Sequence, residues 1–170
     1  EGKEFPTVNP NSNGNAWFVS QIKTVSSADE EMKALDKFDS KNVAIVNTKE
    51  FTIQNKNFVK DASAVITLDD YKPNHLTYTS TNTNAGLAAF SEMCYAKGWK
   101  AYVDGKETPI YRADYVLRAI EIPAGKHQLE FKFEPQVVQT GSLIALVSSI
   151  GMLLLLVGGI YIERKKIKKI

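Results

Sequence analysis

The hydrophobic pattern of this chain changes abruptly near its C-terminus, from short alternating stretches to one unbroken apolar run. Gly141 to Ile162 reads GSLIALVSSIGMLLLLVGGIYI, and no charged residue lies between Glu134 and Glu163. As a helix this run would be about 33 Å long, enough to cross the roughly 30 Å hydrocarbon core of a bilayer. Apolar side chains cover every side of it, whereas a buried core helix usually keeps a polar stripe. We therefore predict a transmembrane helix at 140–162, with a buried core helix as the alternative.

Basic residues follow the apolar run at once. Under the positive-inside rule such a cluster marks the cytoplasmic end of a membrane helix. We therefore expect 163–170 to be a basic cytoplasmic tail and 1–139 to lie on the extracytoplasmic side of the membrane. Because the chain opens with no apolar segment able to act as a signal peptide, we also expect a signal or membrane region upstream of it. The residues that set this topology are Arg164, Lys165, Lys166, Lys168 and Lys169.

Before residue 140 the pattern has the period of two that is typical of strands. The clearest case is 127–134, in which Leu129, Phe131 and Phe133 point one way and polar residues the other, so that one face packs on a core and the other meets water. About eight or nine such short strands, separated by turn signals, predict an antiparallel β-sandwich. We place this domain at 16–139, after a linker at 1–15.

Three further stretches refine the sandwich. Ala16–Val25 is predicted as one strand with Trp17 and Phe18 on opposite faces, and Val43–Val46 as a short buried strand. Between the strands predicted at 99–103 and 108–113, Asp104-Gly105 provides residues that tolerate a positive φ for a hairpin turn.

One short helix interrupts the strands. Ser27-Ala28-Asp29-Glu30 has the form of a capping box, in which the Ser27 hydroxyl accepts from the Glu30 amide and Glu30 reaches back to the Ser27 amide. The helix is predicted over Ala28–Phe38, with its acidic side chains in solvent. Its apolar face would consist of Ala28, Met32 and Leu35.

Composition narrows the classes of function. The net charge is +2 at pH 7, and the tail alone carries five basic residues and one glutamate, so the basic character reflects membrane topology and gives no support for nucleic-acid binding. Cys94, the one cysteine, lacks a disulfide or metal partner and is predicted to be a small buried hydrophobe. His75 and His127 lie beside turns, where exposed residues are a better interpretation than metal ligands. The common catalytic signatures and phosphate loops are absent.

Aromatic and charged residues gather between positions 95 and 118. Aromatic faces beside charged hydrogen-bonding groups are suited to a sugar or a lipid-headgroup sugar. The alternative is that the aromatics belong to the core or to sheet pairs and that the arginines pair with neighbouring acids. The candidate glycan-contacting residues are Trp99, Tyr102, Asp104, Tyr111, Arg112, Tyr115 and Arg118.

The same region carries a resemblance to a known family. FSEMCYAKGWKAYVDGK at 90–106, RADYVLRA at 112–119, PAGKH at 123–127 and FKFEP at 131–135 occur in an order that resembles the C-terminal part of the YfhO family of bacterial membrane proteins. The likeness extends to GNAWFV at 14–19 and to the helix at 30–35. Two positions depart from the family's pattern, since Ala96 stands where a proline is expected and Asp114 where an asparagine is usual.

This resemblance implies a polytopic protein of the bacterial cytoplasmic membrane, of the GT-C glycosyltransferase type. Such a protein adds sugars to cell-envelope polymers from a polyprenyl-phosphate sugar donor, with its catalytic acid in an extracytoplasmic loop near the N-terminus of the full-length protein. The resemblance therefore implies no catalytic residue, metal or cofactor in this chain. The implied partners are the bilayer, upstream transmembrane helices of the same protein and an envelope glycan.

Two functions of different class follow as hypotheses. In the first, the chain is the non-catalytic extracytoplasmic domain and last transmembrane helix of such a protein, and it docks on the membrane part or contacts the acceptor. In the second, it is a membrane-anchored module that either binds glycans or serves as a purely structural β-sandwich.

Overall fold

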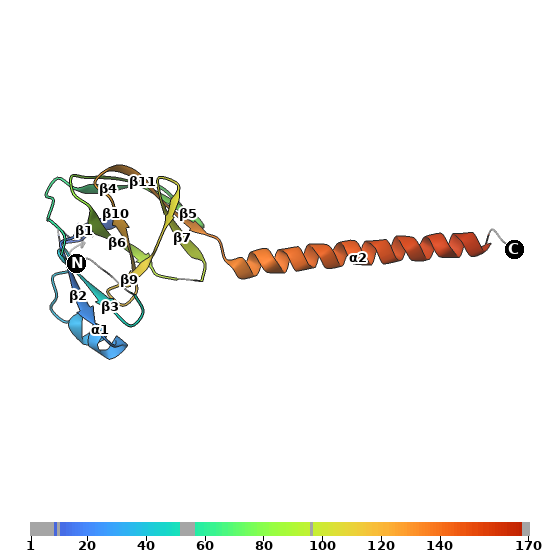
Figure 1. Cartoon of the computed structure of the whole chain (residues 1–170), viewed down its shortest axis with the longest axis horizontal. Helices are drawn as coiled ribbons and strands as arrows, with labels where there is room; N and C mark the ends of the chain where they lie inside the picture. Colours follow the sequence, from blue (N-terminus) through green and yellow to red (C-terminus); the bar gives the residue numbers. More distant parts are fainter. Residues whose placement is uncertain (1–8, 10, 52–56, 96, 168–170) are drawn as a thin grey trace, which may run out of the picture. The chain divides into compact units, whose positions relative to one another are not determined.

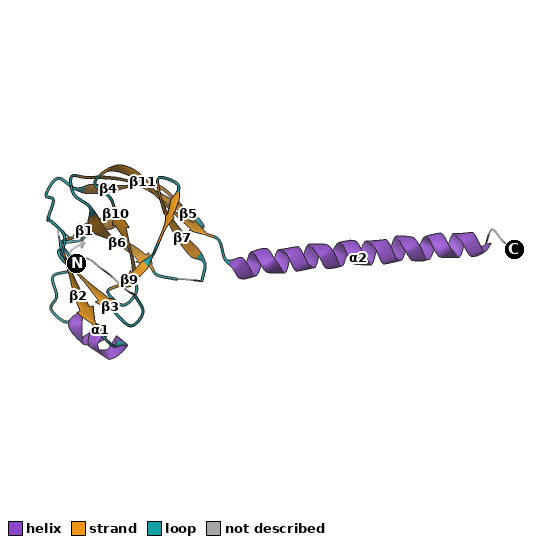
Figure 2. Cartoon of the chain, in the orientation of Figure 1, coloured by secondary structure: helices purple, strands orange, loops and turns teal. Residues whose placement is uncertain are grey.

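The computed structural model describes residues 9, 11–51, 57–95 and 97–167. The chain forms two units that meet between Phe133 and Glu134, a β-rich unit and a unit made of one long helix (Figures 1 and 2). Predictions made for Ala96, Lys168, Lys169 and most of the 1–15 linker lie outside the described residues.

Within the described ranges, the first unit contains eleven strands and one helix. In chain order they are β1 (Ala16–Val19), β2 (Gln21–Val25), α1 (Ala28–Ala34), β3 (Val43–Asn47), β4 (Val65–Lys72), β5 (His75–Asn82), β6 (Gly86–Met93), β7 (Trp99–Val103), β8 (Lys106–Thr108), β9 (Tyr111–Ala113), β10 (Leu117–Ile122) and β11 (Gly125–Phe133).

Two antiparallel sheets form the predicted sandwich. The central sheet has the strand order β1-β6-β10-β9, and the outer sheet has the order β4-β5-β11-β7-β8. Their facing sides share one core, in which Phe90 of the central sheet makes edge-to-face contacts with Tyr78 and Phe131 of the outer sheet, with ring centroids 5.1 and 4.8 Å apart. The predicted fold, a mainly β sandwich with one short helix and a C-terminal helix, is confirmed.

A third layer, which the sequence did not predict, covers the other side of the central sheet. It consists of the parallel pair β2–β3 together with α1. On β6, Ala88 and Phe90 face the outer sheet while Leu87 and Ala89 face this layer, and all four side chains are fully buried. Both faces of β6 are therefore dry, which explains why its sequence is continuously apolar and does not alternate.

The stretch predicted as one strand at Ala16–Val25 is two strands. Ser20 separates them: its N–H and its hydroxyl both donate to the carbonyl of Asn42, and its own carbonyl accepts from the Phe58 N–H. As a result β1 pairs with β6, whereas β2 pairs with β3. The prediction that Trp17 and Phe18 point to opposite faces is confirmed, because Trp17 packs under the third layer and Phe18 packs between the two large sheets.

Helix α1 begins as predicted but differs in its cap and its buried face. Ser27 Oγ accepts from the Glu30 N–H at 3.2 Å, while the Glu30 carboxylate accepts from the N–H and hydroxyl of Ser26, not from Ser27. The helix ends at Ala34, with Leu35 as its C-cap residue. Two residues further on, Lys37 takes a positive φ of 57°, which does not continue the helix. The predicted apolar face is correct for Leu35, which packs in the third layer, but wrong for Ala28, which is exposed, and for Met32, which is 53% exposed. The buried residues of the helix are Glu31 and Ala34.

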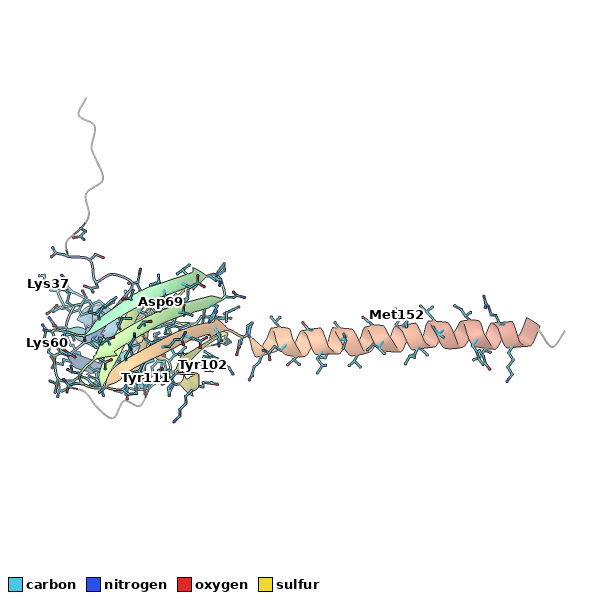
Figure 3. All side chains as sticks on the ribbon, turned by 90° about the horizontal axis from the view of Figure 1, so that it is seen from above. Lys37, Lys60, Asp69, Tyr102, Tyr111 and Met152 are labelled. Carbon is cyan, nitrogen blue, oxygen red and sulfur yellow. The ribbon has the colours of Figure 1, made fainter. Side chains whose placement is uncertain are left out.

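The second unit is helix α2 (Gln136–Ile167). Its stretch Gln136–Ile162 is 27 residues long and apolar enough to cross a membrane, and none of its most apolar window is buried against the described residues. Met152, for example, projects from the helix with 66% of its surface exposed (Figure 3). The helix starts four residues before the predicted boundary at 140, and the hydroxyl of Ser149 donates to the carbonyl of Ala145 within it.

Candidate functional site

The seven predicted glycan-contacting residues do not share one surface. They lie on β7, β9, β10 and the turns after β7 and β9, and the structure places them in several different surroundings. Each group is described by its contacts, because these contacts determine which side chains remain available to a ligand.

Arg118 and Trp99 lie together at one end of the sandwich. The Arg118 side chain is 2% exposed, and its guanidinium carbon lies 4.2 Å from the ring centroid of Trp99 and 5.1 Å from that of Phe131. Its Nε donates to the carbonyl of Met93 at 3.0 Å, and its Nη2 lies 3.4 Å from a carboxylate oxygen of Glu92. Burial lowers the pKa of Arg118, and Glu92 opposes that shift. The guanidinium is thus held by groups of the protein interior.

Tyr102 and Asp104 belong to the solvent side of the outer sheet. The ammonium of Lys132 lies 5.0 Å from the ring centroid of Tyr102. Asp104, in the predicted hairpin turn with a φ of 51°, accepts from His127 Nδ1 at 2.6 Å and from the Gln128 N–H at 2.9 Å. The hydrogen bond with His127 is the main reason that the pKa of Asp104 is lowered, and it raises the pKa of His127.

Tyr111 packs into the core between the central sheet and the third layer. Its ring meets Phe51 edge-to-face, with the centroids 6.1 Å apart. Burial raises the pKa of Tyr111, and the nearby Glu121 carboxylate adds to the rise. This tyrosine therefore serves mainly as a core residue.

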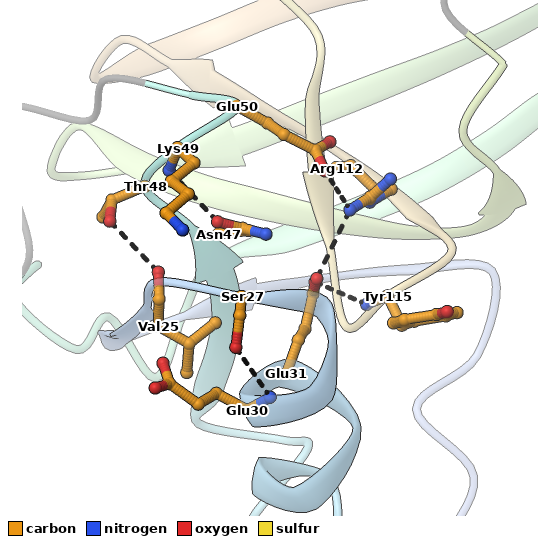
Figure 4. Close-up of polar contacts among 10 residues, drawn as sticks. All are labelled: Val25, Ser27, Glu30, Glu31, Asn47, Thr48, Lys49, Glu50, Arg112 and Tyr115. Atoms are coloured by element: carbon orange, nitrogen blue, oxygen red, sulfur yellow. Dashed lines mark hydrogen bonds and ion pairs between the residues drawn. The ribbon is translucent and has the colours of Figure 1, made fainter.

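Arg112 and Tyr115 are brought together by a residue that was not predicted, Glu31. Its side chain is completely buried, and one carboxylate oxygen accepts from the Tyr115 N–H at 3.0 Å while the other lies 3.4 Å from Arg112 Nη2 (Figure 4). Arg112 also pairs with Glu50 at 2.8 Å, and its guanidinium carbon lies 5.8 Å from the centroid of the Tyr115 ring. Tyr115 itself remains 37% exposed.

Asp114 completes this cluster from the turn between β9 and β10. Its N–H donates to the carbonyl of Ile45 and its carboxylate accepts from the Ile45 N–H, both at 2.8 Å, so the turn is attached to β3 like an additional strand residue. Asp114 and Tyr115 both take positive φ angles, 49° and 71°. Burial raises the pKa of Asp114 to about 6, and the Glu31 carboxylate adds repulsion in the same direction.

The burial of Glu31 contradicts the prediction that the acids of this helix lie in solvent. A signal for it was present in the sequence. Positions 31, 34, 35 and 38 follow the i, i+3, i+4, i+7 spacing of one helix face, and Ala34, Leu35 and Phe38 are all apolar and pack in the third layer. A glutamate in such a stripe needs a buried partner, and Arg112 and the Tyr115 amide provide it.

Among the described residues, no group of three or more His, Cys, Asp or Glu side chains is close enough to hold a metal ion. Cys94 is partly buried, and burial raises the pKa of its thiol, so it is a poor nucleophile at neutral pH.

A cavity of about 230 Å³ lies away from the predicted residues. It opens where the end of β1 meets the 58–64 loop and the β5–β6 connection. None of the seven candidate residues lines it; its polar lining includes Ser20, Lys41, Asn42, Lys60, Asp61 and Asn82.

Comparisons with known proteins identify a family and a relative. The family model described as "Bacterial membrane protein YfhO" matches residues 31–145. The "Uncharacterized protein YfhO" of Bacillus subtilis (strain 168) is 26% identical over 129 residues, which cover 76% of this chain but only 14% of that protein. The chain thus corresponds to about a seventh of its relative's length. No solved structure matches the chain.

Proposed function

Because the chain belongs to the YfhO family of bacterial membrane proteins, we propose that its β-sandwich is a non-catalytic, extracytoplasmic domain carried on a transmembrane helix. The domain docks on the membrane part of the same protein and supports the glycosylation of envelope polymers. The whole protein, of which this chain is a small part, transfers sugar from a polyprenyl-phosphate donor to a cell-envelope polymer.

One observation carries the proposal, the contrast between the two units. The α2 stretch Gln136–Ile162 is exposed and apolar, whereas several charged groups of the sandwich, including Arg112 and Arg118, pair with acids of the same domain. Exposed apolar side chains surround α2, and such a surface is stable only in lipid or against other membrane helices. The basic residues that follow it favour a cytoplasmic C-terminus, so the sandwich would lie outside.

The non-catalytic role rests on how the acids of the domain are used. Glu31 is tied to Arg112 and the Tyr115 amide, and Asp114 is tied to Ile45. A general acid or base must reach a substrate proton, and these two carboxylates are buried inside the domain. The burial of these two acids supports the proposal that the catalytic groups of the whole protein lie outside this chain.

Cysteine labelling in intact cells tests the orientation. In a cysteine-free background of the full-length protein, which includes Cys94→Ala, a cysteine at Lys126 should react with a membrane-impermeant maleimide in intact cells. A cysteine at Lys165 should react only after permeabilisation. The opposite pattern would place the sandwich in the cytoplasm and end the proposal.

Deletion tests the docking role. Removal of residues 16–133 from the full-length protein should lower its amount in the membrane and abolish glycosylation of the envelope polymer. A control variant that replaces the exposed Asp29 with alanine should retain both. Unchanged glycosylation and abundance after the deletion would refute a supporting role.

Contact with the acceptor glycan is a second candidate function, and the exposure of Tyr115 beside Arg112 favours it. Replacement of Tyr115 by alanine should weaken binding of envelope glycan fragments to the detergent-solubilised chain several-fold. Tyr71→Ala is the matched control, because Tyr71 is 61% exposed and lies outside the candidate set. Equal binding by the two variants would remove the glycan contact from this site.

A further inference from the structure

Apolar and aromatic side chains are exposed at the end of the sandwich where β11 finishes. Met93 is 70% exposed, Tyr95 51%, Val116 45% and Phe133 39%. We call these four residues the terminal patch. The chain keeps them close together, because Cys94, which lies between Met93 and Tyr95, donates its N–H to the carbonyl of Val116.

The terminal patch is held in place by its neighbours. The ring of Phe133 lies 6.4 Å from that of Tyr95 and 5.4 Å from that of Trp99, between ring centroids. It rests on Gly98, where an added Cβ would overlap the ring. The N–H groups of Gly98 and Trp99 both bond to the carbonyl of Tyr95, and these bonds hold Tyr95 close to the residues that contact the Phe133 ring. These side chains are exposed, yet contacts with their neighbours fix their positions.

The covalent chain limits how far Phe133, one residue of this patch, can be from the first turn of α2. Only Glu134 and Pro135 separate Phe133 from Gln136. With at most 3.8 Å between successive Cα atoms, the three steps span no more than about 11 Å. This limit holds for any angle between the sandwich and the helix.

We propose that the terminal patch rests in the headgroup region of the bilayer that α2 crosses. The inference builds on the proposed membrane-spanning role of α2. A bilayer surface is the occupant that the connection favours, because the patch is continuous along the chain with an apolar helix. Tyr95, which has an apolar ring and a polar tip, suits that depth. Lys97, exposed within the same loop, can extend toward lipid phosphates.

The opposite end of the sandwich provides a control. The antiparallel register places Val65 with Thr81 and Gly125 with Asn82, so Val65 lies at the start of β11 and Phe133 at its end. Val65 and Lys126 both pair with Thr81, and seven strand steps of about 3.3 Å separate Lys126 from Phe133 by roughly 23 Å. Val65 is 55% exposed, so it matches Met93 in character but not in position.

The test uses the full chain in vesicles of phosphatidylcholine and phosphatidylglycerol. In a Cys94→Ala background, single cysteines replace Met93, Val65 or Met152 and carry a fluorescent label. A lipid with a nitroxide at its headgroup should quench the label at 93 several-fold more than the label at 65. A lipid with a nitroxide deep in its acyl chain should quench the label at 152.

Each result has one interpretation. Quenching at 152 but equally weak quenching at 93 and 65 would overturn the patch proposal and leave the membrane helix intact. Absence of quenching at 152 would instead overturn the membrane-spanning role on which the patch depends. If the label at 93 were shielded from a water-soluble quencher in vesicles but not quenched by the headgroup nitroxide, a second copy of the chain would cover the patch, and the bilayer contact would be wrong.

Discussion

The carboxylate of Glu31 accepts a hydrogen bond from the backbone N–H of Tyr115 at 3.0 Å, and this bond joins helix α1 to the turn between β9 and β10. The turn contains two consecutive non-glycine residues in the left-handed region, Asp114 and Tyr115. Such a conformation costs about 1 kcal/mol or more for each residue and persists only where surrounding contacts hold it. The Glu31 carboxylate fixes Tyr115 through its N–H, and the Ile45 backbone fixes Asp114.

Replacement of Asp114 by asparagine should stabilise the protein near pH 8 and have little effect near pH 4. The pKa of Asp114 is raised to about 6 by burial, so the folded protein binds this proton more tightly than the unfolded chain does. Stability is therefore lost as the pH rises from about 4 through 6, by on the order of 2 to 3 kcal/mol. Asparagine keeps an oxygen for the Ile45 N–H and tolerates the positive φ.

Thermal unfolding of the detergent-solubilised chain at the two pH values measures this effect. Asp36→Asn, on an exposed residue, is the control and should shift the midpoint equally at both. A stabilisation by Asp114→Asn that is the same at pH 4 and pH 8 would contradict the role of the buried charge.

Truncation of Glu31 to alanine should destabilise the protein by about 3 kcal/mol, because it leaves the Tyr115 N–H unbonded and removes a buried partner of Arg112. Glu31→Gln should cost less, since its amide oxygen can still accept from Tyr115. Asp29→Ala, on the exposed side of the same helix, should stay within about 0.5 kcal/mol of the wild type. Denaturant titration followed by circular dichroism measures the free energy of unfolding of the three variants. An equal decrease for Asp29→Ala and Glu31→Ala would be inconsistent with a buried glutamate.

Arg118→Lys should destabilise the domain by about 2 to 4 kcal/mol, although it retains the charge. Lysine cannot stack its flexible ammonium between Trp99 and Phe131, as the flat guanidinium does, while donating to the Met93 carbonyl. The emission of Trp99 should change with it, measured in a Trp17→Phe background. Arg164→Lys, beyond the apolar stretch of α2, is the control. An Arg118→Lys variant as stable as this control would show that stacking contributes little.

Replacement of His127 should destabilise the protein most at acidic pH. The Asp104 hydrogen bond raises the pKa of His127, so its contribution to stability is complete below the unfolded pKa near 6.5 and disappears as the pH rises through the folded pKa. His127→Gln should therefore lower the melting temperature more at pH 5.5 than at pH 9. The neighbouring Lys126→Gln should show no such difference. A His127→Gln effect that is independent of pH would rule out the ion pair as its cause.

Much of the sandwich could be predicted because its signals are local. The strand at 99–103, the turn at Asp104-Gly105 and the alternation of β11 depend on residues a few positions apart, and the structure agrees with them. The opposite orientation of Trp17 and Phe18 also follows from the strand period alone.

The remaining features depend on contacts between distant segments. Ser20 ends β1 because its backbone bonds to Asn42 and Phe58. Nothing in the sequence around Ser20 indicates that the chain changes its pairing partner there. Glu31 is buried because Arg112 and Tyr115 lie about eighty positions further along the chain. The seven candidate residues were close in sequence, but alternate strand residues face opposite sides of a sheet, so the fold separated them into core, turn and surface.

The position of β6 at the middle of the three layers also sets an order of folding. Its partners are β1 on one side and β10 on the other, so the central sheet is complete only when residues 16–19, 86–93 and 117–122 have met. Contacts over such separations form slowly, since the intervening chain must first be closed into loops. During synthesis the apolar strand therefore emerges before its last partner exists, and within the sandwich the 86–90 segment is open to self-association until β10 has been made.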